Sequence, residues 1–353
     1  MNKKIISIIA FALVVIFALS GCDGCIITPE LTVNNAFNGG VSDPQTGYKE
    51  TLKYDVEYSD EGIAANLKSM ENVKFDFSFG TYQTDFEVLS ALPTEINGTK
   101  IESNIISSLA DNDKQAYRLK SIFSIDVNYV IDGVENKRTD TIESEVYFCN
   151  RSLAYAPVYS RTTSSYTVLQ MGSNSGLPII INSVSQTIYQ KENYKIDFSY
   201  YYSNFNDENL EVQSSSKTYD YTFKTITDNS MLFFIIRNSE IELEKTIGIP
   251  VVTPNYGEAS SLAINNANKE TRKFQLNYNY QPYEVDLSIS KLRFSKNDVG
   301  ASGTQQVLYV QNKVENSPIP YKALPVIYNE PLTTFGSFQS MGQLIYTLTD
   351  III

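Results

Sequence analysis

Apolar and polar residues alternate along most of the chain, and the alternation begins near residue 50. Residues 52–58 place aliphatic or aromatic side chains at every second position with charged side chains between them, and residues 73–79 repeat this pattern. Successive side chains of an extended chain point to opposite faces, so period-two alternation is typical of a half-buried β-strand. Both segments are therefore predicted to be strands with one face toward a core.

Most of the remaining chain is also predicted to be extended. The expected strands are 123–131, 139–149, 153–171, 187–205, 212–226, 231–237, 239–247, 272–280, 282–294, 305–314, 323–328 and 343–353. Apolar residues at helical spacing predict a short helix within 60–70, and a second short helix is expected near 101–109. Asp132-Gly133 predicts a β-hairpin, with either a two-residue loop or a longer one that includes residues 135–137.

This succession of elements predicts the fold class. Many antiparallel strands with one or two short helices indicate a mainly β protein built on one large curved antiparallel sheet, arranged as a half-barrel or a sandwich. We see no repeat of the length that propellers or solenoids require. The chain ends on Asp350-Ile351-Ile352-Ile353, an apolar end that suits a paired strand better than a loose tail.

The N-terminus has the pattern of an export signal. Lys3 and Lys4 precede an apolar run that extends to Leu19. A membrane-spanning helix needs about 20 apolar residues, and this run is shorter. Leu19-Ser20-Gly21-Cys22 resembles the lipobox of bacterial lipoproteins. The resemblance implies that Cys22 carries a diacylglyceryl group and becomes the first residue of the mature chain, on the extracytoplasmic face of the membrane.

Three regions follow from this interpretation. Residues 1–21 are the predicted signal peptide, and residues 22–47 are a flexible tether rich in Gly, Pro and Asn. Residues 48–353 are predicted to form a single all-β domain, and 172–178 is the candidate boundary if there are two domains.

Charge and composition exclude several functions. The net charge is −12, and removal of the signal peptide with Lys3 and Lys4 lowers it to −14. Such an acidic chain repels nucleic acid, and it would need the lipid rather than a basic patch to hold it at a membrane. The sequence contains no histidine, which excludes Ser-His-Asp and Cys-His catalysis and the commonest zinc ligand. No metal or cofactor is predicted.

The three cysteines favour no redox chemistry. Cys22-Asp23-Gly24-Cys25 matches a C-x-x-C redox pattern. Lipidation of Cys22 would consume one thiol, and no helix is expected to lower the pKa of the other. A disulfide between Cys25 and Cys149 is open in an exported protein, although Cys25 lies in the tether.

Motifs of catalytic type are interpreted as chance matches. Ser214-x-x-Lys217 and Ser288-x-x-Lys291 match the S-x-x-K pattern of serine acylases, which requires a helix that brings the two side chains together. Both pairs fall in or between predicted strands. Two series of glutamates, Glu143 with Glu145 and Glu240 with Glu242 and Glu244, share strand faces. Such a spacing could suit a glycosidase pair or a cation, but a solvated strand face is the preferred interpretation.

The 25 tyrosines are the most distinctive feature of the composition. Tyrosine combines a large apolar ring with one polar group, so it suits ligand and partner surfaces as well as sheet packing. Two predicted strands gather tyrosines on faces that we expect to point inward, as do Tyr54 and Tyr58 nearer the start. The candidate ligand-facing residues are Tyr194, Tyr200, Tyr202, Tyr278 and Tyr280. A ligand cleft and a packed core are both open for these faces.

The body of the chain also resembles a known superfamily. Long strands after a short helix, the Asp132-Gly133 hairpin and residues 145–160 are similar to exported half-barrel domains of the lipoprotein-localisation type. That resemblance implies a curved sheet around an apolar cavity for acyl chains. Residues 228–237 also resemble a pattern in uncharacterised exported all-β domains.

These features predict a lipid-anchored, extracytoplasmic, non-enzymatic binding module. Its ligand would be apolar or amphipathic, or another component of the cell envelope. A structural or interaction lipoprotein without a small-molecule cavity is the alternative, and a carboxylate-based hydrolase is the third hypothesis.

The lipid anchor is directly testable. Bacteria that express the chain and are fed a clickable fatty acid should label the wild type, because Cys22 supplies the thiol that is alkylated. Cys22→Ser should abolish the label, and Cys25→Ser should keep it as a matched control. Equal labelling of wild type and Cys22→Ser would refute the anchor.

Overall fold

The computed structural model describes residues 46–68, 73–101, 116–131, 133–151, 154–170, 177–190, 192–203, 212–221, 226–237, 244, 246–253, 259–296, 306–311, 324–333 and 340–353. The predicted signal peptide, Cys22, Cys25 and almost all of the tether lie outside these residues. Most of the helix expected near 101–109 and the glutamates 240 and 242 also lie outside them.

The described chain is mainly β-structure. The strands are β1 Lys49–Ser59, β2 Val73–Leu89, β3 Glu95–Ile96, β4 Thr99–Lys100, β5 Ala116–Ile131, β6 Val134–Arg151, β7 Ala154–Gln170, β8 Leu177–Tyr189, β9 Asn193–Ser203, β10 Gln213–Asp220, β11 Thr227–Asp228, β12 Thr246–Val252, β13 Ser260–Tyr278, β14 Gln281–Lys296, β15 Gln306–Gln311, β16 Pro325–Thr333 and β17 Ser340–Ile352. The described helices are α2 Ala65–Lys68, the short 3₁₀ helix η2 Asn229–Met231 and α4 Leu232–Arg237. None of them is long and apolar enough to cross a membrane. The prediction of a mainly β protein with few helices is confirmed.

Fifteen of the strands form one sheet, which is not closed into a barrel, in the order β10-β9-β8-β7-β6-β5-β2-β1-β17-β16-β15-β14-β13-β12-β11. The chain starts in the middle strand, β1, and proceeds outward to one edge at β10. It then crosses to the opposite edge at β11 and returns strand by strand until β17 pairs with β1. The apolar C-terminal end is therefore a strand in the centre of the sheet.

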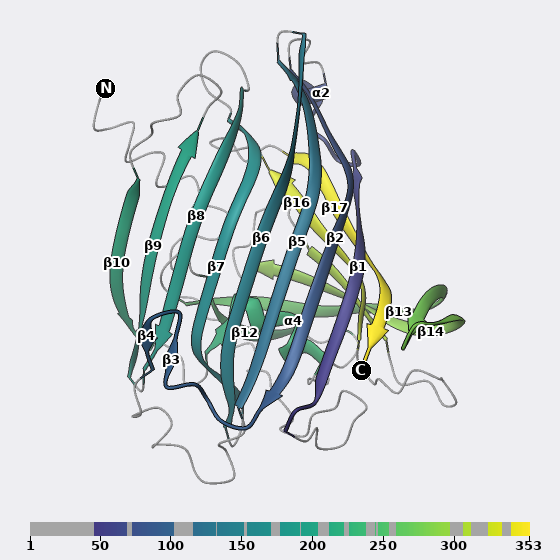
Figure 1. Cartoon of the computed structure of the whole chain (residues 1–353). Coiled ribbons are helices and arrows are strands. Elements are labelled where there is room, and N and C mark those ends of the chain that lie inside the picture. The colour runs from purple at the N-terminus through teal and green to yellow at the C-terminus, as the bar shows by residue number, and fades with distance from the viewer. Residues whose placement is uncertain are drawn as a thin grey trace.

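The sheet is mixed rather than wholly antiparallel. Short parallel pairings join β11 to β12 and β13 to β17, and every other described pairing is antiparallel. Figure 1 shows β1, β2 and β5 to β10 side by side, with β12 to β14 passing behind them at a steep angle. The two halves of the sheet thus face each other, as in the predicted sandwich.

Two apolar cores fill the space between the halves. The first joins β2, β5 and β6 to β12, β13 and β14, and it surrounds α4 with side chains such as Phe86, Phe148 and Phe294. The second lies against β1 and β17 and contains side chains such as Val56, Ile289 and Leu348. Each core takes the inward-facing positions of the alternating segments, as their period predicts.

Residues 231–237 are the main correction to the predicted elements, because they form the end of η2 and then α4 instead of a strand. A continuous apolar run fits a buried strand or a buried helix equally well. Here Leu232, Phe234, Ile235 and Ile236 are all buried, so the segment has no polar face. A helix bonds its own backbone groups, which a lone strand between two sheet halves could not do. The Asp228 side chain starts the turn by accepting a hydrogen bond from the Ser230 N–H at 2.8 Å.

Turns account for the other corrections. The expected strand 187–205 is two strands, because Gln190 donates its N–H to the Asn193 carbonyl at 2.8 Å and reverses the chain between β8 and β9. Of the expected strand 239–247, Glu244 lies in a turn and Thr246 and Ile247 belong to β12, and the other residues lie outside the described part of the chain. The Asp132-Gly133 hairpin is confirmed in its short form, since Ile131 pairs with Val134 and Gly133 has a φ of 82°.

A buried ion pair connects α4 to the central strand. Arg237, in the last turn of α4, donates from Nη1 and Nη2 to the two carboxylate oxygens of Glu50 in β1, at 2.6 and 3.0 Å. The two residues are 5% and 2% exposed. Two parallel charge-assisted bonds of this kind fix both the distance and the orientation of the groups.

Breaking this pair should destabilise the protein strongly. Arg237→Met leaves the Glu50 carboxylate buried and unmatched, so the free energy of unfolding should fall by about 3–5 kcal/mol in urea denaturation. The double variant Glu50→Met/Arg237→Met should lose less, because no charge remains buried.

The exposed pair Lys273–Glu284, with side chains 72% and 57% exposed, provides the control. Lys273→Met should change the free energy of unfolding by no more than about 1 kcal/mol. An effect of Arg237→Met as small as that would contradict the assigned role.

Candidate functional site

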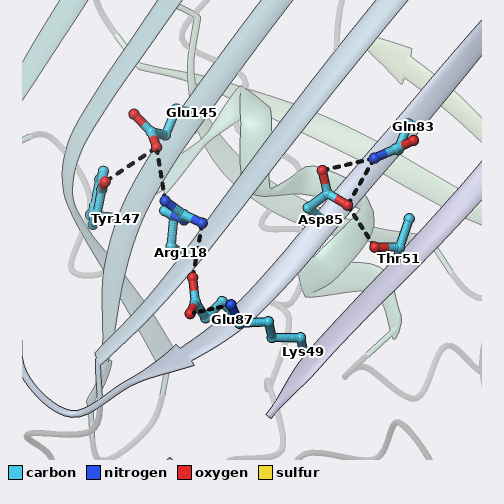
Figure 2. Close-up of polar contacts among 8 residues, drawn as sticks. All are labelled: Lys49, Thr51, Gln83, Asp85, Glu87, Arg118, Glu145 and Tyr147. Carbon is cyan, nitrogen blue, oxygen red and sulfur yellow. Dashed lines mark hydrogen bonds and ion pairs between the residues drawn. The ribbon is translucent and has the colours of Figure 1, made fainter. Parts of the chain in front are cut away.

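The outer face of the central strands is a polar ladder exposed to solvent. Figure 2 shows that Arg118 lies between Glu87 and Glu145, with nitrogen–oxygen distances of 2.8 and 3.8 Å. Glu145 also accepts a hydrogen bond from the Tyr147 hydroxyl at 3.2 Å, and Glu143 lies 3.9 Å from Lys120. The predicted carboxylate pair Glu143 and Glu145 is therefore part of a cross-strand network of opposite charges, as expected for a solvated face.

The remaining catalytic-type motifs do not form a site in the described residues. Ser214 and Lys217 lie in the exposed edge strand β10, and Ser288 and Lys291 lie in β14, so no helix brings either serine to its lysine. Glu244 is exposed in a turn with a φ of 64°, not on a strand face. The described part of the chain contains no group of three or more Cys, Asp or Glu that could hold a metal ion.

Tyr194 is a core residue. It is 1% exposed and lies between the rings of Tyr189 and Tyr219, with centroids 6.0 and 5.5 Å away. Its hydroxyl accepts the Ala259 N–H at 2.7 Å. Neighbouring Tyr189 donates to Asp228, so this group of rings forms a packed core with its polar groups matched.

Tyr200 lies on the same face of β9 but is only half buried. It stacks on Phe198, with ring centroids 5.4 Å apart and planes at 25°. The backbone of Tyr202 is paired with Ile181, but its side chain lies outside the described part of the structure.

Tyr278 and Tyr280 lie at the hairpin between β13 and β14, on the other side of the molecule from β9 (Figure 1). Tyr278 is half buried and contacts the ring of Tyr283 edge to face. Tyr280 is 72% exposed, because β13 ends at Tyr278 and the loop residues Asn279 and Tyr280 both have positive φ, 47° and 65°. The five tyrosines selected from the sequence are therefore not brought together.

A different set of tyrosines converges on the inner face of the central strands. We call Tyr54, Tyr82, Tyr328, Tyr346 and Glu330 the tyrosine–glutamate cluster. They come from β1, β2, β16 and β17, which the sheet order places next to or near one another. Tyr54 is paired with Tyr82, and Tyr328 with Tyr346. The ring of Tyr346 lies 5.5 Å from that of Tyr82 and 5.1 Å from that of Tyr328.

Glu330 is the charged member of the cluster. Its Oε2 accepts a hydrogen bond from the Tyr346 hydroxyl at 2.6 Å, and no Lys or Arg of the described residues pairs with it. Burial raises the pKa of the Glu330 carboxyl, and the hydrogen bond from Tyr346 offsets only part of this rise. Burial also raises the pKa of Tyr82 to about 12 and the pKa values of Tyr328 and Tyr346 well above 10, with Glu330 adding to each.

A signal for this site is present in the sequence, but the predicted strand stopped short of it. Tyr328 and Glu330 are two residues apart, and so share a strand face. The predicted strand ended at Tyr328, whereas β16 continues to Thr333. A carboxylate on the inward face of an otherwise apolar strand is unusual. This position in the sequence could have identified Glu330 as a candidate site residue.

Cys149 is buried on the face opposite the first core. It packs with Tyr147, Val158 and Tyr159 under Ile96 and Ile101, and its Sγ lies 3.7 Å from the Ala156 carbonyl oxygen. Because Cys25 is outside the described residues, a disulfide between the two stays a prediction.

Comparison of the chain with models of protein families, with curated proteins and with solved structures finds no match.

The raised pKa of Glu330 makes stability depend on pH. The folded protein holds the Glu330 proton more tightly than the unfolded chain, so its stability should fall as pH rises from the unfolded pKa through the folded pKa. Tyr82, Tyr328 and Tyr346 face the carboxyl group but titrate far above this range. Glu330→Gln should therefore increase the free energy of unfolding at pH 8, and this gain should vanish below about pH 4.

Denaturation of both proteins at a series of pH values would measure the difference. Glu57→Gln, an exposed substitution on the opposite face of β1, is the control and should show no such trend. A gain for Glu330→Gln that is independent of pH would contradict the prediction.

Proposed function

We propose that the protein is a lipid-anchored, extracytoplasmic binding module that holds an amphipathic ligand or another envelope component without catalysis. The observation that carries the proposal is the tyrosine–glutamate cluster. Four aromatic rings and one carboxyl group meet on an inner sheet face, and the carboxyl group lacks a basic partner among the described residues. Binding sites typically combine apolar and aromatic walls with a few polar groups.

The anchor in this proposal rests on Leu19-Ser20-Gly21-Cys22 and its resemblance to a lipobox. The absence of histidine from the sequence and the separation of the Ser–Lys motifs on strands both favour binding over catalysis. The carboxylates of the outer face are already engaged with Arg118 and Lys120.

A structural or interaction role is the second candidate, and Tyr280 is the observation that favours it. A bulky residue with positive φ is strained, and Tyr280 is too exposed to recover this cost by packing. Such a side chain suits contact with another molecule at the hairpin tip.

The two roles predict different effects of mutation: the binding role predicts loss of a co-purified small molecule, and the structural role predicts loss of a cross-linked partner. Full-length protein purified from bacteria in a non-ionic detergent should retain a small molecule that solvent extraction and mass spectrometry can identify. Tyr82→Leu/Tyr328→Leu should lose it, because two walls of the site are removed, and Tyr280→Gly should keep it. The same extract from all three proteins would refute ligand binding at the cluster.

Loss of an envelope partner from Tyr280→Gly alone, seen by cross-linking in cells, would favour the structural role.

A further inference from the structure

Three buried acids, Glu50, Asp140 and Asp228, and the partly buried Glu330 differ in how their charge is matched. Glu50 is paired with Arg237 through two bonds, and Asp140 lies 2.9 Å from the Arg138 Nε and accepts two bonds from Thr167. Asp228 receives three hydrogen bonds, from Ser160, Tyr189 and Ser230. Among the described residues Glu330 receives one, from Tyr346. Partial burial removes some of the water around the Glu330 carboxylate, and one neutral donor replaces only part of it. A cation placed beside the carboxylate would therefore be stabilised.

The surroundings of Glu330 specify what kind of cation fits. Tyr82 meets Tyr346 nearly edge to face at 86°, and Phe233 of α4 meets Tyr328 at 73° with centroids 4.8 Å apart. Aromatic ring faces carry partial negative charge and attract cations, which they bind best when the cation is weakly hydrated. A primary ammonium would need several hydrogen-bond acceptors to replace its water, whereas a quaternary ammonium has no N–H group and needs none.

The cluster has partly exposed and buried members. Tyr82, Tyr328 and Glu330 are each only half buried, while Tyr54 and Tyr346 behind them are each 5% exposed. The Tyr54 hydroxyl is already engaged with the Pro325 carbonyl, at 3.0 Å. The partly exposed members of the cluster are therefore Tyr82, Tyr328 and Glu330.

We propose that the tyrosine–glutamate cluster binds a quaternary ammonium group, with Glu330 as the counter-charge and the rings of Tyr82, Tyr328 and Tyr346 as the walls. This inference rests on the proposed binding function and names the chemistry of its ligand. The ammonium group belongs either to a small soluble molecule or to a lipid headgroup of the choline type.

Calorimetric titration of the full-length protein in a maltoside detergent tests the site with choline chloride as the probe. The neutral isostere 3,3-dimethylbutan-1-ol has the same shape without the charge, so it should bind at least about tenfold more weakly. This comparison requires no variant. Equal affinity for the two molecules, or no choline binding at concentrations up to about 100 mM, would overturn the proposal.

Variants then assign the binding to the cluster. Glu330→Gln should weaken choline binding about tenfold, and Tyr82→Leu should weaken it to a similar degree. Tyr346→Phe keeps the ring and should retain binding within a few-fold. Glu57→Gln on the opposite face is the matched control and should bind as the wild type does. An unchanged affinity in Glu330→Gln would overturn the proposal.

Monomeric dihexanoyl phosphatidylcholine and phosphatidylglycerol separate the two ligand sources. Tighter binding of the choline lipid than of choline itself would identify a lipid headgroup, and equal binding would identify a soluble cation. Equal binding of both lipids would count against recognition of the ammonium group.

The outcomes also separate this inference from the proposed function. A co-purified ligand that leaves Tyr82→Leu/Tyr328→Leu, together with no choline binding, would keep the binding function and refute the cation. Choline binding that depends on Glu330, without any co-purified ligand, would support the cation site on its own.

Discussion

The bidentate pair between Glu50 and Arg237 constrains the whole architecture. Glu50 is in the central strand of the sheet, and Arg237 ends the short helix that the chain forms as it passes from one edge of the sheet to the other. Two charges removed from water must be matched by each other, since few other groups inside the fold can replace their hydration. The pair therefore holds α4 between the two halves of the sheet, where Leu232, Phe234, Ile235 and Ile236 are buried.

The outer and inner faces of the central strands have opposite physical roles. On the outer face, Lys49, Glu87, Arg118 and Glu145 alternate in sign from strand to strand and stay in contact with solvent. Each such pair contributes little to stability, but together they favour one register, because a shift by one residue would exchange the charged face for the apolar one. On the inner face the same strands supply the cores and the tyrosine–glutamate cluster.

Tyrosines occupy inner-face positions where the ring packs in the core and the hydroxyl group also forms a hydrogen bond with a polar group. Tyr54 bonds a backbone carbonyl, Tyr189 bonds Asp228, and Tyr194 accepts a backbone N–H. Glu330 departs from this pattern, because its charge is not matched by a base among the described residues. Burial raises the pKa of its carboxyl group, so the fold disfavours the ionised form.

The amino-acid sequence by itself indicated many of the extended segments and, within them, the positions that point inward, because period-two alternation is a property of each local segment. It therefore predicted the mainly β fold, the Asp132-Gly133 hairpin and a strand at the C-terminal end. The lipobox at Cys22 is also a local pattern, and the lipid anchor stays a prediction from it. Only the tertiary structure decided that residues 232–237 are helical, since an apolar run carries no period that separates a buried helix from a buried strand.

Only the tertiary structure decided which tyrosines meet. Tyr280 belongs to a strand by its pattern but lies in a turn, and Tyr54 and Tyr82 reach Tyr328 and Tyr346 only because β1 pairs with β17. The bond from the Tyr54 hydroxyl to Pro325 joins positions 271 residues apart. Alternation tells which face a side chain takes, but the neighbours on that face depend on strand order. That order is set by burial and charge matching over the whole chain.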